Sequence, residues 1–378
     1  MTNEFHQEII DQIKKFRLEQ IEPLLEKDDH EGIFRKEIFN QLGELGFTGM
    51  TIPEEFGGAE LSYSDFCVFL EELSKTSVPY AVTVSVSSMV QSILNKFGTQ
   101  DQKNTYLPEL TSGQEIGAFA LSESGSGSDA SSLKTTAKET SNGFILNGSK
   151  LWITSGGVAK TYIVMARTGG EGSKGVSAFI VRDGDNGFHY GKNESKMGWR
   201  TSPTRELLFQ NCEIPKNRLI GQLNEGMKVA LSALDAGRIT IGAISVGLAQ
   251  RALDESVRYS LSREQFGQKI FEFQGLQFMM ADMDTEIEAS RLLVYQAANL
   301  LDSGNPNPKI SSMAKLKSSD TAMSVTTDAV QILGGVGYTK EYPVERLMRD
   351  AKVLQIVEGT NQIQRVVIAR NLRKSFNY

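Results

Sequence analysis

The chain has 378 residues, 40% of them hydrophobic and 23% charged, and a length beyond the ~250–300 residues of a single core predicts two or three packed units. A formal net charge of −6 argues against a nucleic-acid-binding surface, and the two cysteines, Cys67 and Cys212, together with three histidines, lack the spacing of a disulfide framework or a metal site. No run of ~18 consecutive apolar residues predicts a membrane span, and the polar start does not resemble a signal peptide, so we expect a cytoplasmic protein, or one of the mitochondrial matrix in a eukaryote.

The region from 1 to about 118 has helical periodicity. Ile9, Ile13 and Phe16 recur at the spacing of one helix face, and Phe66, Phe69, Leu70 and Leu73 do so in a second segment. Ser62 or Ser64 is a suitable N-cap for that second segment. These patterns predict an N-terminal α-helical domain over 1–118.

Residues 119–228 have a different pattern, with short β-rich runs separated by turn residues. Asn142-Gly143 and Asn147-Gly148 are both typical hairpin-turn dipeptides, and Gly169–Gly172 predicts a further turn. Runs such as 162–165, 176–181 and 206–209 predict strands. A small β-barrel or β-sandwich domain is therefore expected here.

Helical periodicity returns in residues 229–378. Met280, Met283, Ile287 and Val294 belong to one apolar stripe, and Ile241, Ile244 and Leu248 belong to another. Long helices joined by short links predict an antiparallel four-helix bundle. The fold class is therefore α+β and multi-domain, in the order helices, strands, helices.

Three segments carry residues suited to chemistry. The first, 118–129, follows an apolar run and is crowded with hydroxyls and glycines, which offer small donors and close backbone approach to a polar ligand. A flexible loop is the alternative. The segment lacks the Gly-x-Gly-x-x-Gly fingerprint of a dinucleotide-binding fold.

The second segment contains Trp152, one of only two tryptophans, two residues before Thr154. A tryptophan face can stack on a planar ligand and a threonine hydroxyl can bond its edge. The alternative is a tryptophan in the core of the β domain.

The third segment contains Glu358 among apolar residues and directly before Gly359-Thr360. Desolvation raises the pKa of a carboxyl group and makes it a better base near neutral pH. The alternative is an acidic residue at a helix N-terminus before a threonine cap.

These three segments, together with 235–250, 262–274 and 331–338, resemble in this order the signatures of the acyl-CoA dehydrogenase family. The resemblance covers nearly the whole chain, and the pattern is most similar to short-chain and short branched-chain members. It implies FAD-dependent desaturation of an acyl-CoA thioester to the trans-2-enoyl-CoA, with electron-transfer flavoprotein as electron acceptor and a homotetrameric assembly.

The resemblance also implies roles for individual residues. Glu358 matches the catalytic base, which takes the α-proton while the β-hydride passes to flavin N5. The positions that match substrate contacts are Ser128, Asp235, Arg238 and Gly359. The positions that match FAD contacts are Leu121, Ser122, Gly127, Trp152, Thr154, Arg263, Phe266, Gln274, Gln331, Gly334, Gly335, Thr360 and Gln362, and of these Gln331, Gly334 and Gly335 are implied to come from a neighbouring subunit.

Two positions depart from the common family pattern, and a third bears on which residue can be the base. Ser124 replaces a usual proline and Val357 a frequent tyrosine, and neither change removes a group needed for the chemistry. Some members carry their base just before the arginine that matches Arg238, where this chain has Gly237. Within the resemblance, only Glu358 is left to act as the base.

Other functions remain open on the sequence alone. A flavin-dependent acyl-CoA oxidase would use the same residues, and a non-catalytic acyl-CoA-binding flavoprotein would have no need of Glu358. A carrier-protein thioester is a further alternative, which Asp235 and Arg238 disfavour. A serine hydrolase is the weakest alternative, because 124–127 lacks the leading glycine of a nucleophile elbow and the only histidine that follows is His189.

Overall fold

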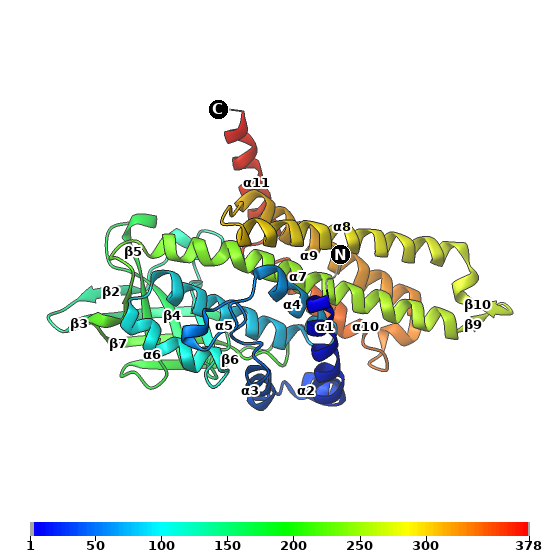
Figure 1. Ribbon diagram of the computed structural model, residues 1–378, viewed down its shortest axis with the longest axis horizontal. Coiled ribbons are helices and arrows are strands. Elements are labelled where there is room, and N and C mark those ends of the chain that lie inside the picture. The colour runs from blue at the N-terminus through cyan, green and yellow to red at the C-terminus, as the bar shows by residue number, and fades with distance from the viewer. Residues whose placement is uncertain (1–3, 377–378) are drawn as a thin grey trace.

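The computed structural model describes residues 4–376. Helices form the N-terminal third, strands the middle and long helices the remainder, so the predicted order of helices, strands and helices is confirmed. In Figure 1 the sheet lies at the left of the molecule and the long C-terminal helices extend to the right.

The N-terminal region consists of helices joined by loops. Its elements are α1 (Glu4–Phe16), η1 (Arg17–Ile21), η2 (Glu22–Leu24), α2 (Leu25–Glu31), α3 (Lys36–Glu44), η3 (Glu54–Phe56), α4 (Tyr63–Ser74), α5 (Val78–Phe97) and α6 (Gln100–Thr111). Ser62, one of the two predicted caps, accepts from the backbone of Asp65 and forms a capping box that begins α4. Nearly every residue of α5 is buried, because this helix lies against both β1 (Gly117–Ala120) and the first long C-terminal helix.

The middle region is one mixed sheet. Its other elements are β2 (Thr136–Glu139), β3 (Gly143–Thr154), β4 (Thr161–Arg167), β5 (Val176–Arg182), β6 (Phe188–Asn193), β7 (Thr204–Pro215) and β8 (Leu219–Ile220), with single turns at η4 (Ala130–Ser132), η5 (Ser173–Gly175) and η6 (Lys216–Arg218). The strand order is β6-β7-β3-β2-β4-β5-β8, and β1 pairs in parallel with β4. Strands β4 and β5 are buried on both faces, which explains their unbroken apolar runs.

Strand β3 departs from the sequence prediction. The Asn142-Gly143 dipeptide does turn the chain between β2 and β3, but Asn147-Gly148 lies inside β3 and makes no turn. The pairing of β3 with β7 instead shifts register between Leu146 and Gly148, and again between Lys150 and Ile153. These β-bulges accommodate Gly148 at φ +138° and re-aim the side chains that follow.

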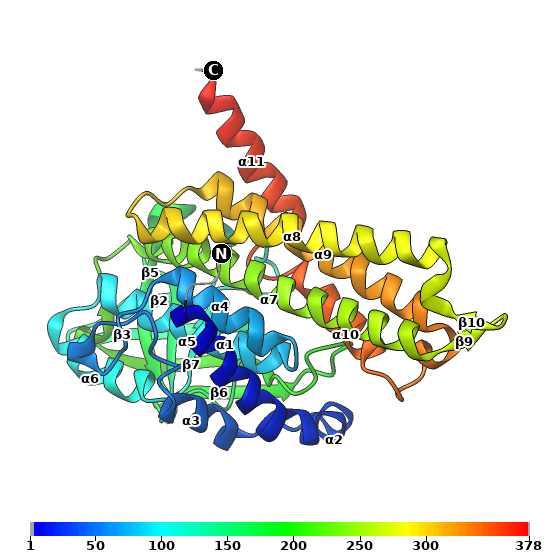
Figure 2. The ribbon, with the colours of Figure 1, turned by 45° about the vertical axis from the view of Figure 1, so that its right-hand side comes forward.

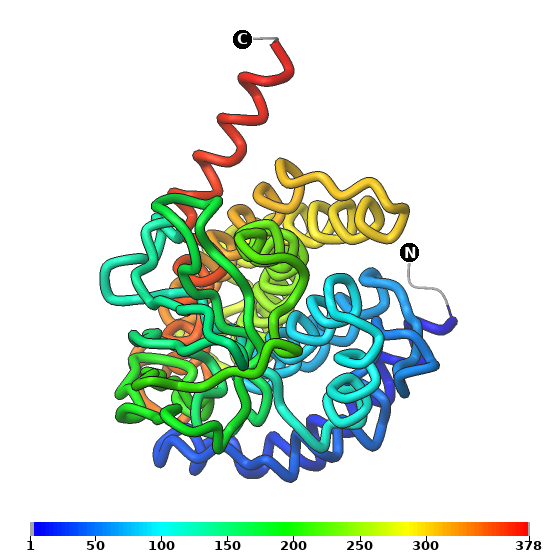
Figure 3. Tube along the Cα trace, turned by 90° about the vertical axis from the view of Figure 1, so that its left-hand side faces the viewer, coloured from blue at the N-terminus to red at the C-terminus, as the bar shows by residue number. Residues whose placement is uncertain are grey.

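The C-terminal region consists of long helices. Its elements are α7 (Gly226–Ser262), β9 (Glu264–Gln265), β10 (Gln268–Lys269), η7 (Ile270–Glu272), α8 (Gln274–Asp302), α9 (Pro308–Leu333), η8 (Gly334–Tyr338), α10 (Val344–Leu354) and α11 (Asn361–Ser375). Helices α7, α8 and α9 pack on one another through the predicted stripes, and α10 packs on α7 and α9. Helix α11 projects away from the body of the chain (Figures 2 and 3).

Helix α7 has the length and mean hydropathy of a membrane span, although no span was predicted. However, 72% of its most apolar 18-residue stretch is buried inside the protein. Its apolar residues therefore serve the core between the helices and the sheet.

Candidate active site

Glu358 lies in the short loop between α10 and α11 and has an unusual backbone conformation. Its φ is +54° and that of Gly359 is +86°, so two consecutive residues are left-handed. The Thr360 hydroxyl then accepts from the backbone N–H of Ile363 and caps α11. The sequence alternative of an acidic residue before a threonine cap is thus correct for Thr360, which caps the helix. Glu358 precedes that cap in a strained turn.

The carboxyl group of Glu358 points toward α7 and α5. A Cβ atom built on Gly237 would lie 2.6 Å from Oε2 of Glu358 and 2.7 Å from the methyl carbon of Met89. The Glu358 side chain is largely buried, and its Oε2 has no hydrogen-bond partner among residues 4–376. A buried oxygen without a partner is free to accept a proton or a donor from a ligand.

Burial raises the pKa of Glu358 to about 7, because the charged form loses its hydration. The cationic side chains of Arg238 and Lys315 oppose this effect. A carboxyl group with a pKa near the working pH is suited to general base catalysis.

Arg238 and Asp235, two of the predicted substrate contacts, lie one turn apart on α7 and contact each other. Arg238 is buried, and its Nη1 donates to Oδ1 of Asp235 at 2.5 Å. Its Nε has no partner within the described chain. Burial raises the pKa of Asp235, and Arg238 opposes the rise.

Two side chains that sequence reasoning missed hold the turn at Glu358. Gln364 donates through Nε2 to the carbonyl oxygens of Glu358, at 3.0 Å, and of Gly359, at 2.8 Å. Lys315, on α9, donates to the carbonyl oxygen of Gly359 at 3.0 Å and to Oδ1 of Asn361 at 2.8 Å.

The predicted flavin-binding segments of the β domain lie side by side. The backbone N–H of Leu151 donates to the carbonyl oxygen of Ser122 at 2.9 Å, which brings the chain after β1 against the end of β3. Trp152 follows at φ +57°, within the second bulge, and its side chain is 58% exposed. The alternative of a core tryptophan is therefore wrong, because the bulge turns the indole outward.

A buried ion pair holds these two segments together. Lys150 is fully buried, and its Nζ donates to Oε1 of Glu123 at 2.7 Å and to the carbonyl oxygen of Leu121 at 3.0 Å. Glu123 also accepts from the backbone N–H groups of Lys134 and Thr135. The pair therefore fixes the position of Leu121 and Ser122 relative to Trp152.

Buried hydroxyl groups near Thr154 support a polar ligand at this edge of the sheet. The next residue, Ser155, has a buried hydroxyl with no partner in the described chain, as do Thr201 and Ser202. The two segments adjoin, since Ser155 donates its backbone N–H to Pro203. Unpartnered donors beside an exposed tryptophan fit a large planar cofactor with polar edges, such as FAD.

Gly127 and Ser128 lie in the exposed part of the loop after Ser122. A Cβ atom on Gly127 would meet nothing within 4 Å, so no close approach inside the chain requires glycine there. Both residues are exposed.

Three further predicted FAD contacts, Arg263, Phe266 and Gln274, lie at the other end of the molecule, around the β9–β10 hairpin. Phe266 is 94% exposed at the tip of the β9–β10 hairpin, flanked by exposed Arg263 and Gln274. Ring contact between Tyr259 and Tyr342 places the segment after η8 at the same end of α7. Figure 2 shows this hairpin far from the sheet, so one chain does not bring all the predicted FAD contacts together. Gln331, Gly334, Gly335 and Gln362 are also exposed.

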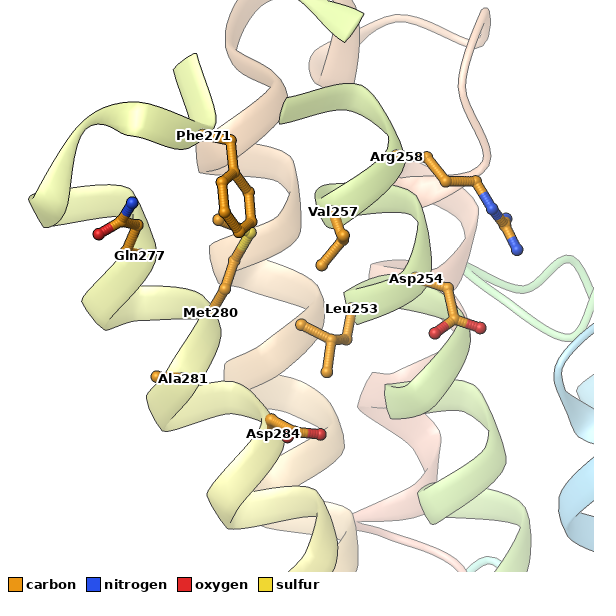
Figure 4. A pocket seen from close by; sticks show the side chains of 9 residues that line it. All are labelled: Leu253, Asp254, Val257, Arg258, Phe271, Gln277, Met280, Ala281 and Asp284. Atoms are coloured by element: carbon orange, nitrogen blue, oxygen red, sulfur yellow. The ribbon is translucent and has the colours of Figure 1, made fainter. Parts of the chain in front are cut away.

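A separate open groove of about 670 Å³ lies between α7 and α8. Figure 4 shows Phe271 of η7 and Met280 of α8 facing each other in it. It contains neither Glu358 nor the β-domain residues. Within residues 4–376 no group of three or more His, Cys, Asp or Glu side chains is arranged to hold a metal ion.

Comparison with protein families gives matches along nearly the whole chain. Residues 3–114 match the acyl-CoA dehydrogenase N-terminal domain, 118–212 the middle domain and 224–373 the C-terminal domain.

Individual relatives agree. Acryloyl-CoA reductase (NADH) of Anaerotignum propionicum is 44% identical, over 96% of this chain and 92% of the relative. Butyryl-CoA dehydrogenase of Megasphaera elsdenii superimposes with a TM-score of 0.97 at 42% identity, covering 98% and 99% of the two chains. A chain in the structure of the electron transferring flavoprotein of Acidaminococcus fermentans has a TM-score of 0.96 at 46% identity, with 98% of each chain covered.

The predictions of family, fold class, enzyme class and FAD as cofactor are thereby confirmed. The chain belongs to the acyl-CoA dehydrogenase family of FAD-dependent enzymes.

Proposed function

We propose that Glu358 is the base that removes the α-proton of a short-chain acyl-CoA thioester. The observation that carries this assignment is its carboxyl group, largely buried, with an unpartnered Oε2 and a pKa raised to about 7 by burial. FAD, when bound, accepts the hydride from the β-carbon. Leu121, Ser122, Trp152 and Thr154 would hold its flavin at the edge of the sheet.

Arg238 and Asp235 are proposed to bind the CoA portion of the substrate. The unpartnered Nε of the buried Arg238 supports this role, because it retains a donor for a ligand. The same guanidinium favours the ionised form of Glu358. Gly359, which we propose to lie next to the thioester, is left-handed, and its carbonyl oxygen accepts hydrogen bonds from Lys315 and Gln364.

The proposed substrate is a saturated short-chain acyl-CoA, linear or branched. The side chain of Met89 reaches the point where Gly237 faces Glu358, and so limits the space beside the base. The butyryl-CoA dehydrogenase and the acryloyl-CoA reductase among the relatives are named for short acyl groups.

A second copy of this chain is proposed to complete the FAD site, within a homotetramer. Arg263, directly before the β9–β10 hairpin, and the exposed Phe266 at its tip lie at the end of the molecule remote from the sheet, whose strand β3 contains Trp152. Gln331, Gly334 and Gly335 lie toward the same end. A symmetric dimer could place the hairpin of one copy beside the sheet of the other.

Electron-transfer flavoprotein is the proposed oxidant of the reduced enzyme, as the Acidaminococcus relative suggests. The relative named acryloyl-CoA reductase favours a second candidate, in which the same residues catalyse the reverse reaction and Glu358 returns the proton to the α-carbon. The direction then depends on the redox partner.

An absorbance spectrum followed by anaerobic titration with a panel of acyl-CoAs tests the proposed function. We expect a yellow protein whose flavin is bleached by butyryl-CoA and reoxidised by electron-transfer flavoprotein faster than by oxygen. Rapid reoxidation by oxygen would instead identify an oxidase, and flavin that no acyl-CoA reduces would identify a binding protein. A preference for long acyl chains would contradict the proposed substrate.

A further inference from the structure

Lys315 is a buried lysine of α9 whose ammonium group forms no ion pair within 4–376. Its side chain is fully buried, and both of its hydrogen-bond acceptors, the Gly359 carbonyl and Oδ1 of Asn361, are neutral oxygens. Burial of a charge without a direct counter-ion is unfavourable, and an apolar side chain would fill the same space without that penalty. Such a position therefore suggests a use beyond packing.

Both acceptors flank the turn that carries the base. Lys315 and Gln364 each donate to the carbonyl oxygen of Gly359, and Gln364 also donates to that of Glu358. A left-handed conformation at a residue other than glycine persists only where the surroundings determine it. These two side chains fix the backbone from which the Glu358 carboxyl group projects.

The charged groups around Glu358 come from two helices. Arg238 of α7 and Lys315 of α9 both favour its ionised form. Asp320, further along α9, bonds Nδ2 of Asn361 at 2.7 Å and favours the charged form of Lys315. Burial lowers the pKa of Lys315 to about 7, with Glu358 and Asp320 opposing the shift and Arg238 adding to it.

We propose that Lys315 is a positioning residue for the base: it holds the turn that carries Glu358, and its ammonium group favours the carboxylate that takes up the substrate proton. The inference rests on the proposed function, because it requires Glu358 to be that base.

The test is the pH dependence of flavin reduction by butyryl-CoA, measured anaerobically on the holoenzyme by stopped flow. Lys315→Met removes the charge and keeps the length of the side chain. Lys317→Met, on the same helix and partly exposed, is the matched control: it removes a lysine that forms an ion pair with Glu286 and lies outside the Glu358 turn.

For Lys315→Met we expect the midpoint of the rate profile to move upward by about one pH unit, which slows reduction about tenfold below the midpoint. FAD content and acyl-CoA binding should remain within about threefold of wild type, a difference well below the tenfold that one pKa unit represents. Lys317→Met should keep the wild-type profile. A Lys315→Met profile with an unchanged midpoint overturns the proposal, whatever the loss of thermal stability.

Asp320→Asn provides a second test if Lys315→Met does not yield a flavoprotein. Asp320 is partly exposed, and asparagine preserves its shape. Lys315 then loses a negative neighbour and gives up its proton at lower pH, so the midpoint of the rate profile should again rise, by less. An unchanged midpoint overturns the proposal here as well. Glu358→Gln, measured in parallel, separates the two failures: if it reduces flavin at the wild-type rate, the base assignment itself is wrong.

Discussion

Gly237 of α7 faces the carboxyl group of Glu358 in the loop before α11, and a Cβ atom added to Gly237 would lie 2.6 Å from Oε2 of Glu358. The atoms that a side chain at 237 would meet are the ends of two flexible side chains, Glu358 and Met89, rather than backbone. A carboxyl group carried by either residue 237 or residue 358 would therefore lie in the same small volume.

This relationship predicts that the base can be moved. Glu358→Gly removes the carboxyl group, suits the left-handed backbone and vacates the space that Gly237 faces. Alone it should slow flavin reduction by ~10²–10⁴-fold, the usual contribution of a positioned base. Adding Gly237→Glu should restore at least part of that rate. Gly237→Gln in the same background is the control, and equal recovery with glutamine would show that the carboxyl group is not responsible.

The pKa of Glu358 predicts a pH-dependent effect on stability. Because its folded-state pKa is raised from 4.5 to about 7, the folded protein holds this proton more tightly than the unfolded chain. The raised pKa therefore stabilises the wild type relative to Glu358→Gln. This stabilisation is fully present below pH 4.5 and is lost as the pH rises through about 7, a change in the free energy of unfolding on the order of 3 kcal/mol. Thermal unfolding should show the glutamine variant gaining stability relative to wild type as the pH rises. A relative loss over that interval would contradict the pKa assignment.

The buried pair of Lys150 and Glu123 predicts a coupled effect on FAD binding. Lys150→Met leaves the Glu123 carboxylate buried without its cation, which costs on the order of 3–5 kcal/mol. The fraction of Lys150→Met protein that retains FAD should also fall, because the ion pair positions Leu121 and Ser122. The double variant Lys150→Met with Glu123→Gln should be more stable than Lys150→Met alone. Unfolding curves and the flavin-to-protein absorbance ratio measure both effects, and an unchanged ratio in Lys150→Met would refute the positioning role.

Completion of the FAD site by a second copy predicts complementation between inactive subunits. Trp152→Ala impairs the sheet side of the site and Arg263→Ala the hairpin side. In a mixed dimer of the two variants, one site then carries both defects and the other carries neither. Co-expression with two different tags and isolation of the mixed oligomer should therefore recover FAD binding and activity. If Arg263 acts within its own chain, each site carries one defect and no recovery follows.

Side-chain periodicity predicted the parts of the fold that depend on burial. The stripe of Met280, Met283, Ile287 and Val294 is buried, as expected for a helix face, and Ser62 caps α4. Local dipeptide preferences failed at Asn147-Gly148, because pairing with β7 extends through it and turns it into a bulge. A second bulge exposes Trp152. The sequence does not predict this bulge, because the alternation of inward- and outward-facing residues along a strand does not show where the pairing register shifts.

The site was predicted where function depends on recognisable segments and missed where it depends on tertiary contacts. Glu358 and Thr360 stand out in the sequence, whereas Gln364 becomes relevant only because α11 brings it back onto the Glu358 turn. Lys315 did leave a signal: it lies four residues from both Ser311 and Ser319, on the buried face of α9. A lysine among small residues on a buried face is a candidate for a functional charge.

The proposed role of Glu358 as the base is tested most directly by anaerobic stopped-flow reduction of the flavin in Glu358→Gln with butyryl-CoA. If Glu358 is the base, the wild-type rate should rise with pH through about 7, the pKa to which burial raises Glu358. The variant should keep its FAD and bind acyl-CoA, yet reduce its flavin ~10²–10⁴-fold more slowly, with no inflection near that pH. Reduction at the wild-type rate in Glu358→Gln would show that Glu358 is not the base.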